Sequence, residues 1–360
     1  MEKIRLGRTG LMVSRVGFGC IPIQRRSRED AAALLRRAVD SGVNFFDTAH
    51  VYGDSEAKLG LAFSGLPRGE LILASKAMAD TREKTMSQLE ESLRRLRTDY
   101  IDLYQWHNPA GLDDFREGGV YRAMLEAKKA GKIRFIGITN HHLARAGRAV
   151  ESGAFDTLQF PLSVLSSREE IGLTFRCREL DLGFIAMKAM CGGMIPDGRL
   201  PFAFLNQYPH IVPVWGIERE EELAQFIELA GRPEPFTPAM REEIEKLRLE
   251  LGDEYCRGCG YCLPCPAGIE LPLMMRIAYF VKRNVEGSQF NEDRLRQVAK
   301  IDDCVNCRGC VEHCPYHLEA PRILRKQRDE FNRLRREFHA LKGRSINNLY
   351  MFRQGTESRQ

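Results

Sequence analysis

The sequence has no long apolar run and no strong excess of either charge. No stretch approaches the roughly 18 uninterrupted apolar residues of a membrane-spanning helix, and the first ten residues, MEKIRLGRTG, lack the apolar core of a signal peptide. A formal net charge of +5 over 360 residues is too small to indicate a nucleic-acid partner. We therefore expect a cytoplasmic protein that binds neither membranes nor nucleic acid.

A second absence bears on the fold. An open, doubly wound sheet that binds a dinucleotide carries a glycine-rich phosphate loop after its first strand, and none is present here. Eight short, apolar, β-rich segments instead alternate with helical patterns. They predict parallel strands closed into an α/β fold, a (β/α)8 TIM barrel. The strands are expected at 15–20, 43–49, 71–77, 101–107, 133–140, 157–163, 183–189 and 211–217. The helices are expected at 28–41, 54–64, 82–97, 119–131, 142–152, 168–181, 201–207 and 219–230.

Cysteine, by contrast, is abundant, and most of it lies in the last hundred residues. Two ladders, CRGCGYCLPCP and CVNCRGCVEHCP, each end in a proline. The second has the bacterial ferredoxin spacing, in which the fourth cysteine ligates the other cluster of a pair; the first departs from it by one residue. We therefore expect two 4Fe–4S clusters. The ligands of the first would be Cys256, Cys259, Cys262 and Cys314, and those of the second Cys304, Cys307, Cys310 and Cys265.

Zinc and disulfide bonds are the alternative uses of these cysteines. Structural zinc favours two ligand pairs separated by a dozen or more residues, whereas each ladder packs four cysteines closely. Disulfides require an oxidising compartment, for which the sequence shows no route. The three remaining cysteines, Cys20, Cys177 and Cys191, are expected to be small buried or half-buried side chains.

Composition also suggests where the domains meet. The segment GRPEPFTP at 231–238 is dense in proline and glycine, which is typical of a boundary. Helical patterns dominate the region that holds the cysteines, so we expect a small α-helical ferredoxin-like iron–sulfur domain. The expected parts are a barrel at 1–235, a linker helix at 236–251, a two-cluster domain at 252–322, and a basic helix and tail at 323–360.

Polar side chains stand at the ends of three predicted strands. Asp47 ends the second strand, with Tyr52 five residues on, Lys76 ends the third and His107 the fourth. A TIM barrel carries its active site at these strand ends. A tyrosine with a pKa of about 10 is a poor acid at neutral pH unless a cation such as Lys76 stabilises its phenolate. Each residue has a structural explanation too, such as an ion pair at the barrel mouth, but four matches in order favour a catalytic set.

The surrounding motifs resemble a known family. LGRTGLMVSRVGFGC and NFFDTAHVYGDSEAKLG are similar to aldo–keto reductases, and the C-terminal part resembles a subgroup with a ferredoxin domain after the barrel. The resemblance implies hydride transfer from a reduced nicotinamide, usually NADPH, to a small aldehyde or ketone, or the reverse with an alcohol. It implies Tyr52 as proton donor, Lys76 as the group that tunes its pKa, Asp47 as the partner of Lys76, and His107 as the residue that orients the carbonyl.

The resemblance also implies contacts for NADP(H) or NAD(H). Thr139 and Asn140 occupy the place of the family's Ser-Asn pair, which holds the nicotinamide carboxamide, and Gln159 matches the glutamine that shares this task. Met187 stands where an aromatic residue usually stacks on the nicotinamide. A thioether can still pack on a ring face.

The expected phosphate-binding turn departs further from the family. It follows the last strand, at Gly216, and a helix N-terminus there could receive a phosphate through backbone N–H groups. Three successive glutamates, 220–222, oppose an anion, and Lys188 and Arg219 are the nearest substitutes for the usual basic pair. NADPH binding is therefore weakened in this expectation, and NADH is an alternative.

The C-terminal region is basic. Nine Lys or Arg and three acidic residues lie between Arg322 and Arg344. Apolar residues repeat there at helical spacing. A solvated helix packed on the body is the first interpretation, and a dock for an acidic redox protein is the second. The apolar residues are Leu324, Phe331, Leu334, Phe338 and Leu341.

Three functions follow from joining the two halves. The first is an oxidoreductase of aldo–keto reductase type that is coupled to one-electron transfer through the clusters. The second is an iron–sulfur electron-transfer protein whose barrel is a scaffold, and the third is a redox sensor. Because nicotinamide exchanges two electrons and each cluster one, a bound flavin would reconcile them, but no flavin motif is recognisable.

Overall fold

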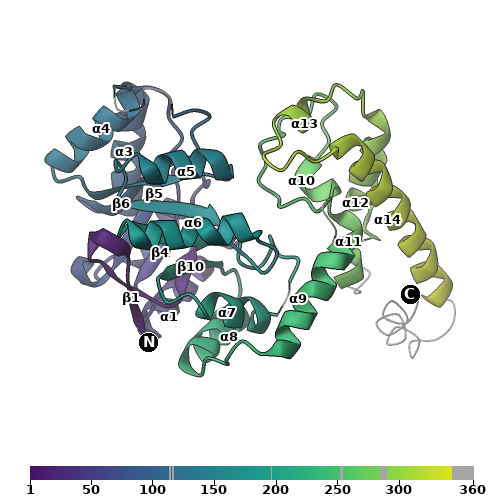
Figure 1. The fold of residues 1–360 in the computed structure, drawn as a ribbon, viewed down its shortest axis with the longest axis horizontal. Helices are drawn as coiled ribbons and strands as arrows, with labels where there is room; N and C mark the ends of the chain where they lie inside the picture. Colours follow the sequence, from purple (N-terminus) through teal and green to yellow (C-terminus); the bar gives the residue numbers. More distant parts are fainter. Residues whose placement is uncertain (113–114, 116, 196, 252–253, 284–289, 343–360) are drawn as a thin grey trace. The chain divides into compact units, whose positions relative to one another are not determined.

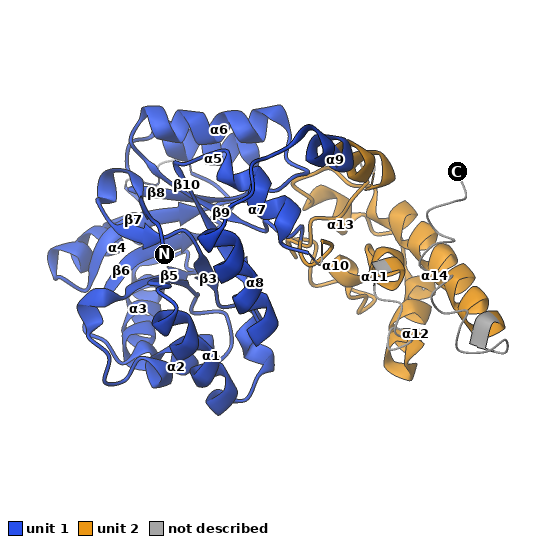
Figure 2. Cartoon of the chain, turned by 90° about the horizontal axis from the view of Figure 1, so that it is seen from below, with its two compact units in different colours: residues 1–191, 197–244 blue, residues 192–196, 245–360 orange. Residues whose placement is uncertain are grey.

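The structure is a computed structural model that describes residues 1–112, 115, 117–195, 197–251, 254–283 and 290–342. The chain forms two compact units (Figure 2). Unit 1 comprises Met1–Cys191 and Asp197–Ile244, and unit 2 comprises Gly192–Pro196 and Glu245–Gln360. The division falls within one helix and assigns a short segment of the barrel sequence to unit 2, so it differs from the limits expected from composition. The expected tail at 343–360 lies outside the described residues.

Unit 1 is a closed barrel of eight parallel strands (Figure 1). Their order around the barrel is β10-β3-β4-β5-β6-β7-β8-β9. The predicted TIM barrel is therefore confirmed, and each strand lies within its predicted segment. The strands are β3 (Gly17–Gly19), β4 (Phe45–Asp47), β5 (Ile72–Ala77), β6 (Ile101–His107), β7 (Ile133–Thr139), β8 (Thr157–Pro161), β9 (Gly183–Met187) and β10 (Ile211–Gly216).

Helices follow the strands and surround the barrel. Local signals set their ends: the Ser27 side chain accepts a bond from the N–H of Asp30 at the start of the first helix, and Ser167 and Glu170 form a capping box at the sixth. The helices are α1 (Arg28–Asp40), α2 (Ser55–Ala62), α3 (Arg82–Leu96), α4 (Gly119–Lys129), α5 (Leu143–Glu151), α6 (Arg168–Glu179), α7 (Arg199–Asn206) and α8 (Glu220–Gly231).

An antiparallel hairpin that the sequence patterns did not predict precedes the barrel. It joins β1 (Lys3–Arg5) to β2 (Met12–Ser14). Its apolar residues pack in one cluster with residues at the starts of the strands, including Phe45 and Ile72. The hairpin therefore covers the N-terminal end of the barrel, which leaves the opposite end for a site.

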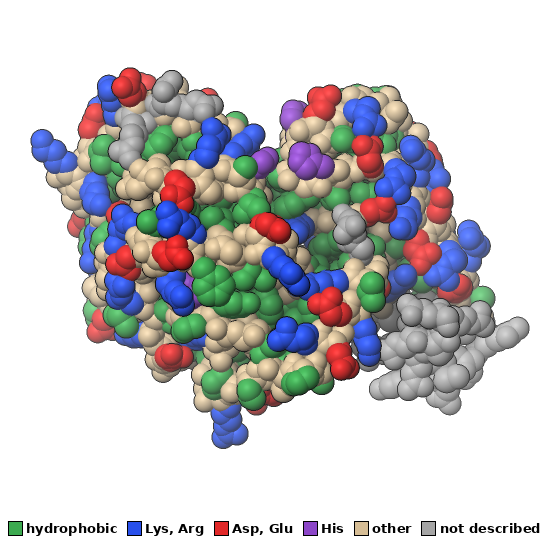
Figure 3. Space-filling model, in the orientation of Figure 1, with side chains coloured by type: hydrophobic (Ala, Val, Ile, Leu, Met, Phe, Trp, Pro, Cys, Tyr) green, Lys and Arg blue, Asp and Glu red, His purple; other side chains and the backbone are tan. Residues whose placement is uncertain are grey.

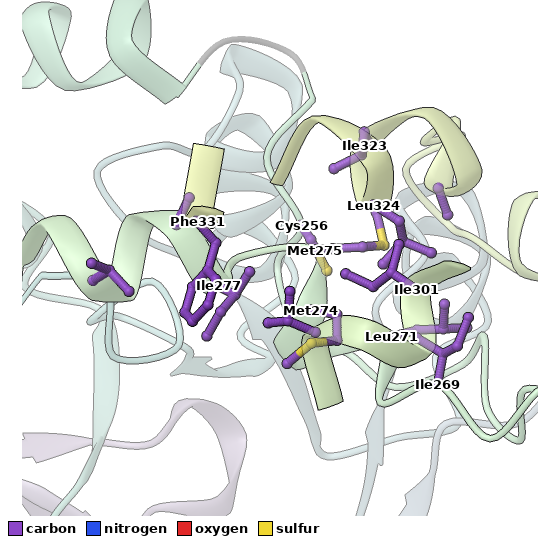
Figure 4. Close-up of a cluster of buried hydrophobic side chains, with 14 of the residues drawn as sticks. Cys256, Ile269, Leu271, Met274, Met275, Ile277, Ile301, Ile323, Leu324 and Phe331 are labelled. Atoms are coloured by element: carbon purple, nitrogen blue, oxygen red, sulfur yellow. The ribbon is translucent and has the colours of Figure 1, made fainter. Parts of the chain in front are cut away.

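Unit 2 is helical, as predicted, and has its own apolar core (Figure 4). Met274, Ile277 and Phe331 are buried in it, and Cys256 is a buried member of the same cluster. The core therefore links the cysteine loops to the long C-terminal helix. The helices are α9 (Pro238–Leu251), which spans the division between the units, α10 (Leu271–Met274), α11 (Ile277–Arg283), α12 (Glu292–Ala299), α13 (Gly309–Glu312) and α14 (Ala320–Lys342).

The surface carries charges of both signs. Figure 3 shows Lys and Arg side chains interspersed with Asp and Glu over the face in view. On α14, Arg328 and Arg333 pair with acidic neighbours. Within the described residues, no helix combines the length and apolar composition that crossing a membrane requires.

Candidate active site and cluster ligands

Asp47 and Lys76 form a buried ion pair at the C-terminal ends of β4 and β5. The parallel register pairs Asp47 with Ala74, so Lys76 stands one strand over and points to the same inner face. Its Nζ donates to Asp47 Oδ2 at 2.7 Å and to the carbonyl oxygen of Thr48 at 2.6 Å. Lys76 is only 1% exposed, so its charge depends on this partner.

Tyr52 and His107 complete the group of four. Lys76 Nζ lies 5.1 Å from the centre of the Tyr52 ring. The rings of Tyr52 and His107 meet edge to face, with centroids 5.8 Å apart and planes at 82°. Lys76 and His107, which follow Asp47 by 29 and 60 positions, are thus brought to the same mouth of the barrel, because parallel strands end on the same side.

The electrostatics of the group favour a protonated tyrosine. Burial raises the pKa of Tyr52, and the nearby Lys76 charge offsets this rise only in part. The net lowering expected from the sequence is therefore absent. Burial by itself would lower the pKa of Lys76, but Asp47 and Tyr52 raise it above its ordinary value. At neutral pH the pair thus consists of a phenol beside an ammonium.

His107 is a neutral imidazole. Burial, and secondarily the Lys76 charge, lower its pKa to about 3. Its Nδ1 is buried and has no hydrogen-bond partner among the described residues. A neutral ring can donate one N–H to a carbonyl oxygen, whereas an imidazolium would repel Lys76.

Two glutamines hold the Asp47 carboxylate from the other side. Gln105 Nε2 donates to Asp47 Oδ1 at 3.2 Å, and Gln159 Nε2 donates to Asp47 Oδ2 at 3.1 Å. Sequence reasoning missed Gln105. Its spacing from His107, two residues along β6, was the available signal, since alternate residues of a strand share a face.

The nicotinamide end of the expected cofactor site fits this chain. Gln159 Oε1 is buried without a partner among the described residues and could accept from a carboxamide N–H. Thr139 and Asn140 are buried beside it, at the end of β7, and Met187 is half-buried at the end of β9. The Asn140 side chain is partly engaged, because its Oδ1 accepts from the N–H of His142 at 2.8 Å.

The other end of the expected cofactor site, where the phosphates of a dinucleotide would bind, fits less well than the nicotinamide end. In barrels a phosphate commonly binds at the N-terminus of a helix after the last strands. Here that position, at the start of α8, is capped by Glu222: its Oε2 accepts from the N–H groups of Glu218 and Arg219 at 2.8 and 3.0 Å. The guanidinium of Arg219 binds Glu222 Oε1 at 3.0 Å.

A second ion pair closes the same turn. Arg25 forms a two-pronged pair with the Glu218 carboxylate, and Arg26 donates to the Glu218 carbonyl oxygen at 2.7 Å. The cations near the turn, Arg219 included, are therefore already bound to groups of that turn. Gly216 lies at the exposed end of β10, and Lys188, just after β9, has a φ of +62°.

The eight clustered cysteines line two adjoining hollows in unit 2. One hollow includes Cys256, Cys259, Cys262 and Cys314 among its lining residues, and the other includes Cys304, Cys307, Cys310 and Cys265. Cys262 and Cys310 line both hollows. Each hollow thus contains the four cysteines of one expected ligand set together with one cysteine of the other, and the assignment of ligands to two clusters stays a prediction.

Disulfide bonds and zinc are the alternative uses of these cysteines. None of the eleven cysteines forms a disulfide in the structure. Among the described residues, no three His, Cys, Asp or Glu side chains lie close enough together to hold one metal ion. Burial raises the pKa of Cys262 to about 12, so its thiolate would need a bound metal to offset the cost of ionisation. The other three cysteines, Cys20, Cys177 and Cys191, are buried, as expected.

The fold is a (β/α)8 barrel, and comparison with known proteins shows the family to which it belongs. Residues 15–201 match the aldo/keto reductase family, and the chain belongs to this family. Residues 248–315 match the 4Fe-4S dicluster domain. The chain is thus an oxidoreductase with an iron–sulfur domain.

Curated relatives match part of the chain. The chain is 32% identical over 224 residues to the uncharacterized oxidoreductase YrpG of Bacillus subtilis, covering 54% of this chain and 68% of YrpG. It is 38% identical over 154 residues to L-galactose dehydrogenase of Arabidopsis thaliana, covering 39% and 48%. It is 39% identical over 130 residues to methylglyoxal reductase DkgB of Escherichia coli O157:H7, covering 35% and 48%. The chain thus spans about half to two thirds of these relatives.

Solved structures share the fold. An aldo-keto reductase from Bacillus halodurans in its holo form aligns with a TM-score of 0.61 and 24% identity, covering 69% of this chain and 96% of that one. A putative aldo-keto reductase from Pseudomonas aeruginosa aligns with a TM-score of 0.55 and 26% identity, covering 67% and 94%. Both matches thus leave about a third of this chain unaligned.

Proposed function

We propose that the barrel interconverts a small carbonyl compound and its alcohol, with Tyr52 as the proton donor in the reducing direction. The phenol is protonated at neutral pH and lies beside a neutral imidazole and a buried ammonium. A carbonyl oxygen that receives negative charge would be stabilised by these donors. A reduced nicotinamide, when bound, supplies the hydride.

The other residues position and tune this proton. Lys76 stabilises the phenolate that remains after transfer, and Asp47, held by Gln105 and Gln159, fixes Lys76 in place. His107 orients the carbonyl oxygen through an N–H. Gln159 Oε1, Thr139 and Asn140 are proposed to hold the carboxamide of the nicotinamide.

The eight cysteines are proposed to hold two 4Fe–4S clusters that connect this chemistry to a one-electron redox protein. Each cluster passes one electron at a time, so two clusters match the two electrons of a hydride. A reducing compartment such as the cytoplasm suits cysteines that form no disulfide and are proposed to bind iron.

The buried Lys76–Asp47 pair beneath Tyr52 carries this proposal. Its test is NADPH-dependent reduction of a panel of small aldehydes and ketones, including methylglyoxal, by Tyr52→Phe. Loss of the proton donor should lower kcat/KM by about 10²- to 10⁴-fold. Tyr100→Phe is the matched control, because Tyr100 stacks against Arg68 on the barrel and takes no part in the group. Equal activity in all three chains would refute the assignment.

The capped phosphate end favours a second candidate, an electron-transfer protein with the barrel as scaffold. Glu222 already occupies the N–H groups that a dinucleotide phosphate would use. This candidate predicts reversible cluster reduction by a ferredoxin-like protein, with the Tyr52→Phe chain unimpaired, and no NADPH-dependent turnover.

A further inference from the structure

Arg276 is a buried cation of unit 2 that has no acidic partner among the residues the structure describes. It lies between α10 and α11 and is 8% exposed. Its Nε donates to the carbonyl oxygen of Pro272 at 2.7 Å, and its Nη1 donates to that of Gly192 at 3.1 Å. Its Cζ lies 5.1 Å from the centre of the Phe280 ring. None of the carboxylates described in the structure forms an ion pair with it.

A buried charge needs a compensating charge. Carbonyl dipoles satisfy N–H groups, but they do not replace an anion for a guanidinium removed from water. The buried lysines of the barrel follow this rule, since Lys76 pairs with Asp47 at 2.7 Å and Lys58 with Asp54 at 2.8 Å. Among the groups that the structure describes around Arg276, none provides such an anion.

The guanidinium lies directly behind the loop that carries the first cysteines. A Cβ on Gly258, between Cys256 and Cys259, would lie 2.7 Å from Arg276 Nη2, so this glycine, with φ +67°, is needed for the close approach. The Gly258 N–H donates to Cys256 Sγ at 3.4 Å. Arg276 is thus separated from a cysteine sulfur by a single glycine.

The neighbours of Arg276 line the same hollow. Pro272, whose carbonyl oxygen it binds, and Met275, which precedes it, lie in the wall formed with Cys256, Cys259, Cys262 and Cys314. Figure 4 shows Met275 beside Cys256. Arg276 does not itself line the hollow, so it belongs to the layer behind the cysteines.

We propose that Arg276 is the counter-ion of the cluster held by Cys256, Cys259, Cys262 and Cys314, and that it raises the reduction potential of this cluster. The inference rests on the proposed ligand sets. A cube bound by four thiolates is negatively charged, and each electron it accepts adds negative charge. A cation fixed in a low-dielectric interior stabilises the reduced form more than the oxidised form. Arg276 acts through the cluster's surroundings and is a positioning residue.

The test is an EPR-monitored redox titration of the anaerobically purified full chain. Arg276→Gln should lower the midpoint potential of one cluster and change the other less, whereas Arg276→Lys, which keeps the charge, should stay near the wild-type value. Arg296→Gln is the control, because this arginine on α12 is exposed and pairs only with nearby acidic residues. Unchanged midpoint potentials in a fully loaded Arg276→Gln chain would overturn the proposal.

If the Arg276→Gln chain does not incorporate its clusters, the iron content of the variants is measured instead. The proposal then predicts that Arg276→Lys retains iron and that Arg276→Gln and Arg276→Met do not, because charge is what the cluster requires. A lysine variant as poor in iron as the glutamine variant would overturn it. A wild-type chain that binds no iron would instead refute the ligand sets, so the two failures are distinguishable.

Discussion

Tyr52 is a protonated phenol at neutral pH, which is the form that the proposed proton transfer requires. Burial raises its pKa, and Lys76 moderates the rise without reversing it. In the proposed reaction, the phenolate left after transfer is stabilised by the Lys76 ammonium, which Asp47 holds in place. The proposed acid, Tyr52, comes from the turn after β4, and its stabiliser Lys76 comes from β5.

The low pKa of His107 makes a testable contribution to stability. It is about 3 in the folded chain and about 6.5 in an unfolded one. Between these values the unfolded chain binds more protons, so the free energy of unfolding decreases as the pH falls from about 6.5 towards 3. In His107→Gln this decrease should be smaller by up to about 1.4 kcal/mol per pH unit.

Urea unfolding of both chains at each pH measures this difference. Comparing them at the same pH removes effects common to both, such as acid loss of iron. Parallel stability curves over this range would show that His107 is not a buried neutral base.

Residue identity at the mouth was largely predictable, but the contacts were not. Sequence order and strand ends indicated Asp47, Tyr52 and Lys76, because parallel strands end together. Gln105 was missed, since a glutamine two residues before a histidine has no motif of its own. Arg276 was missed as well, because its isolation from acidic groups exists only in three dimensions.

At the scale of elements, the N-terminus of α8 shows how a side chain can occupy the backbone N–H groups that a phosphate would bind. The three glutamates of its first turn suggested repulsion of a phosphate, and the structure adds a specific contact, the Glu222 cap. By contrast, the β1–β2 hairpin was not predicted. Its strands are three residues long and largely charged or polar at alternate positions, so they give little β signal.

Removing the charge of this cap should improve NADPH binding. In Glu222→Gln the amide can still cap the helix, but a phosphate no longer competes with a carboxylate. The dissociation constant should fall about fivefold, or ~1 kcal/mol. Nicotinamide fluorescence measures it. Glu221→Gln, in the same turn, controls for general charge removal, and an equal gain in both variants would argue against a specific cap.

The long helix α14 stabilises the cluster unit through its apolar face. Phe331 is fully buried there, with its ring 5.3 Å from that of Phe290. Phe331→Ala should lower the free energy of unfolding of unit 2 by about 3–5 kcal/mol. Iron release in urea reports this unfolding.

Leu249→Ala is the control for this change, because Leu249 on α9 is 84% exposed. It should leave the midpoint of iron release unchanged. If both variants released iron at the wild-type urea concentration, the buried face of α14 would not support the clusters.

At the scale of the whole molecule, the proposed function combines a two-electron reaction in the barrel with one-electron transfer in the cysteine-rich unit. The barrel is suited to a two-electron carbonyl reaction, and the cysteine unit to one-electron steps. Composition and motifs distinguished the barrel from the cysteine-rich part of the sequence. They did not indicate that Gly192–Pro196 belongs to unit 2, where the Gly192 carbonyl oxygen accepts from Arg276.

The most direct test of electron transfer between the barrel and the clusters is a reductive titration of the anaerobically purified chain. Iron and sulfide are counted first, and NADPH is then added, with and without free flavin, while the visible absorbance of the clusters is recorded. The account predicts about eight irons per chain and loss of that absorbance on addition of NADPH. Eight irons that dithionite reduces but NADPH leaves oxidised under both conditions would contradict it.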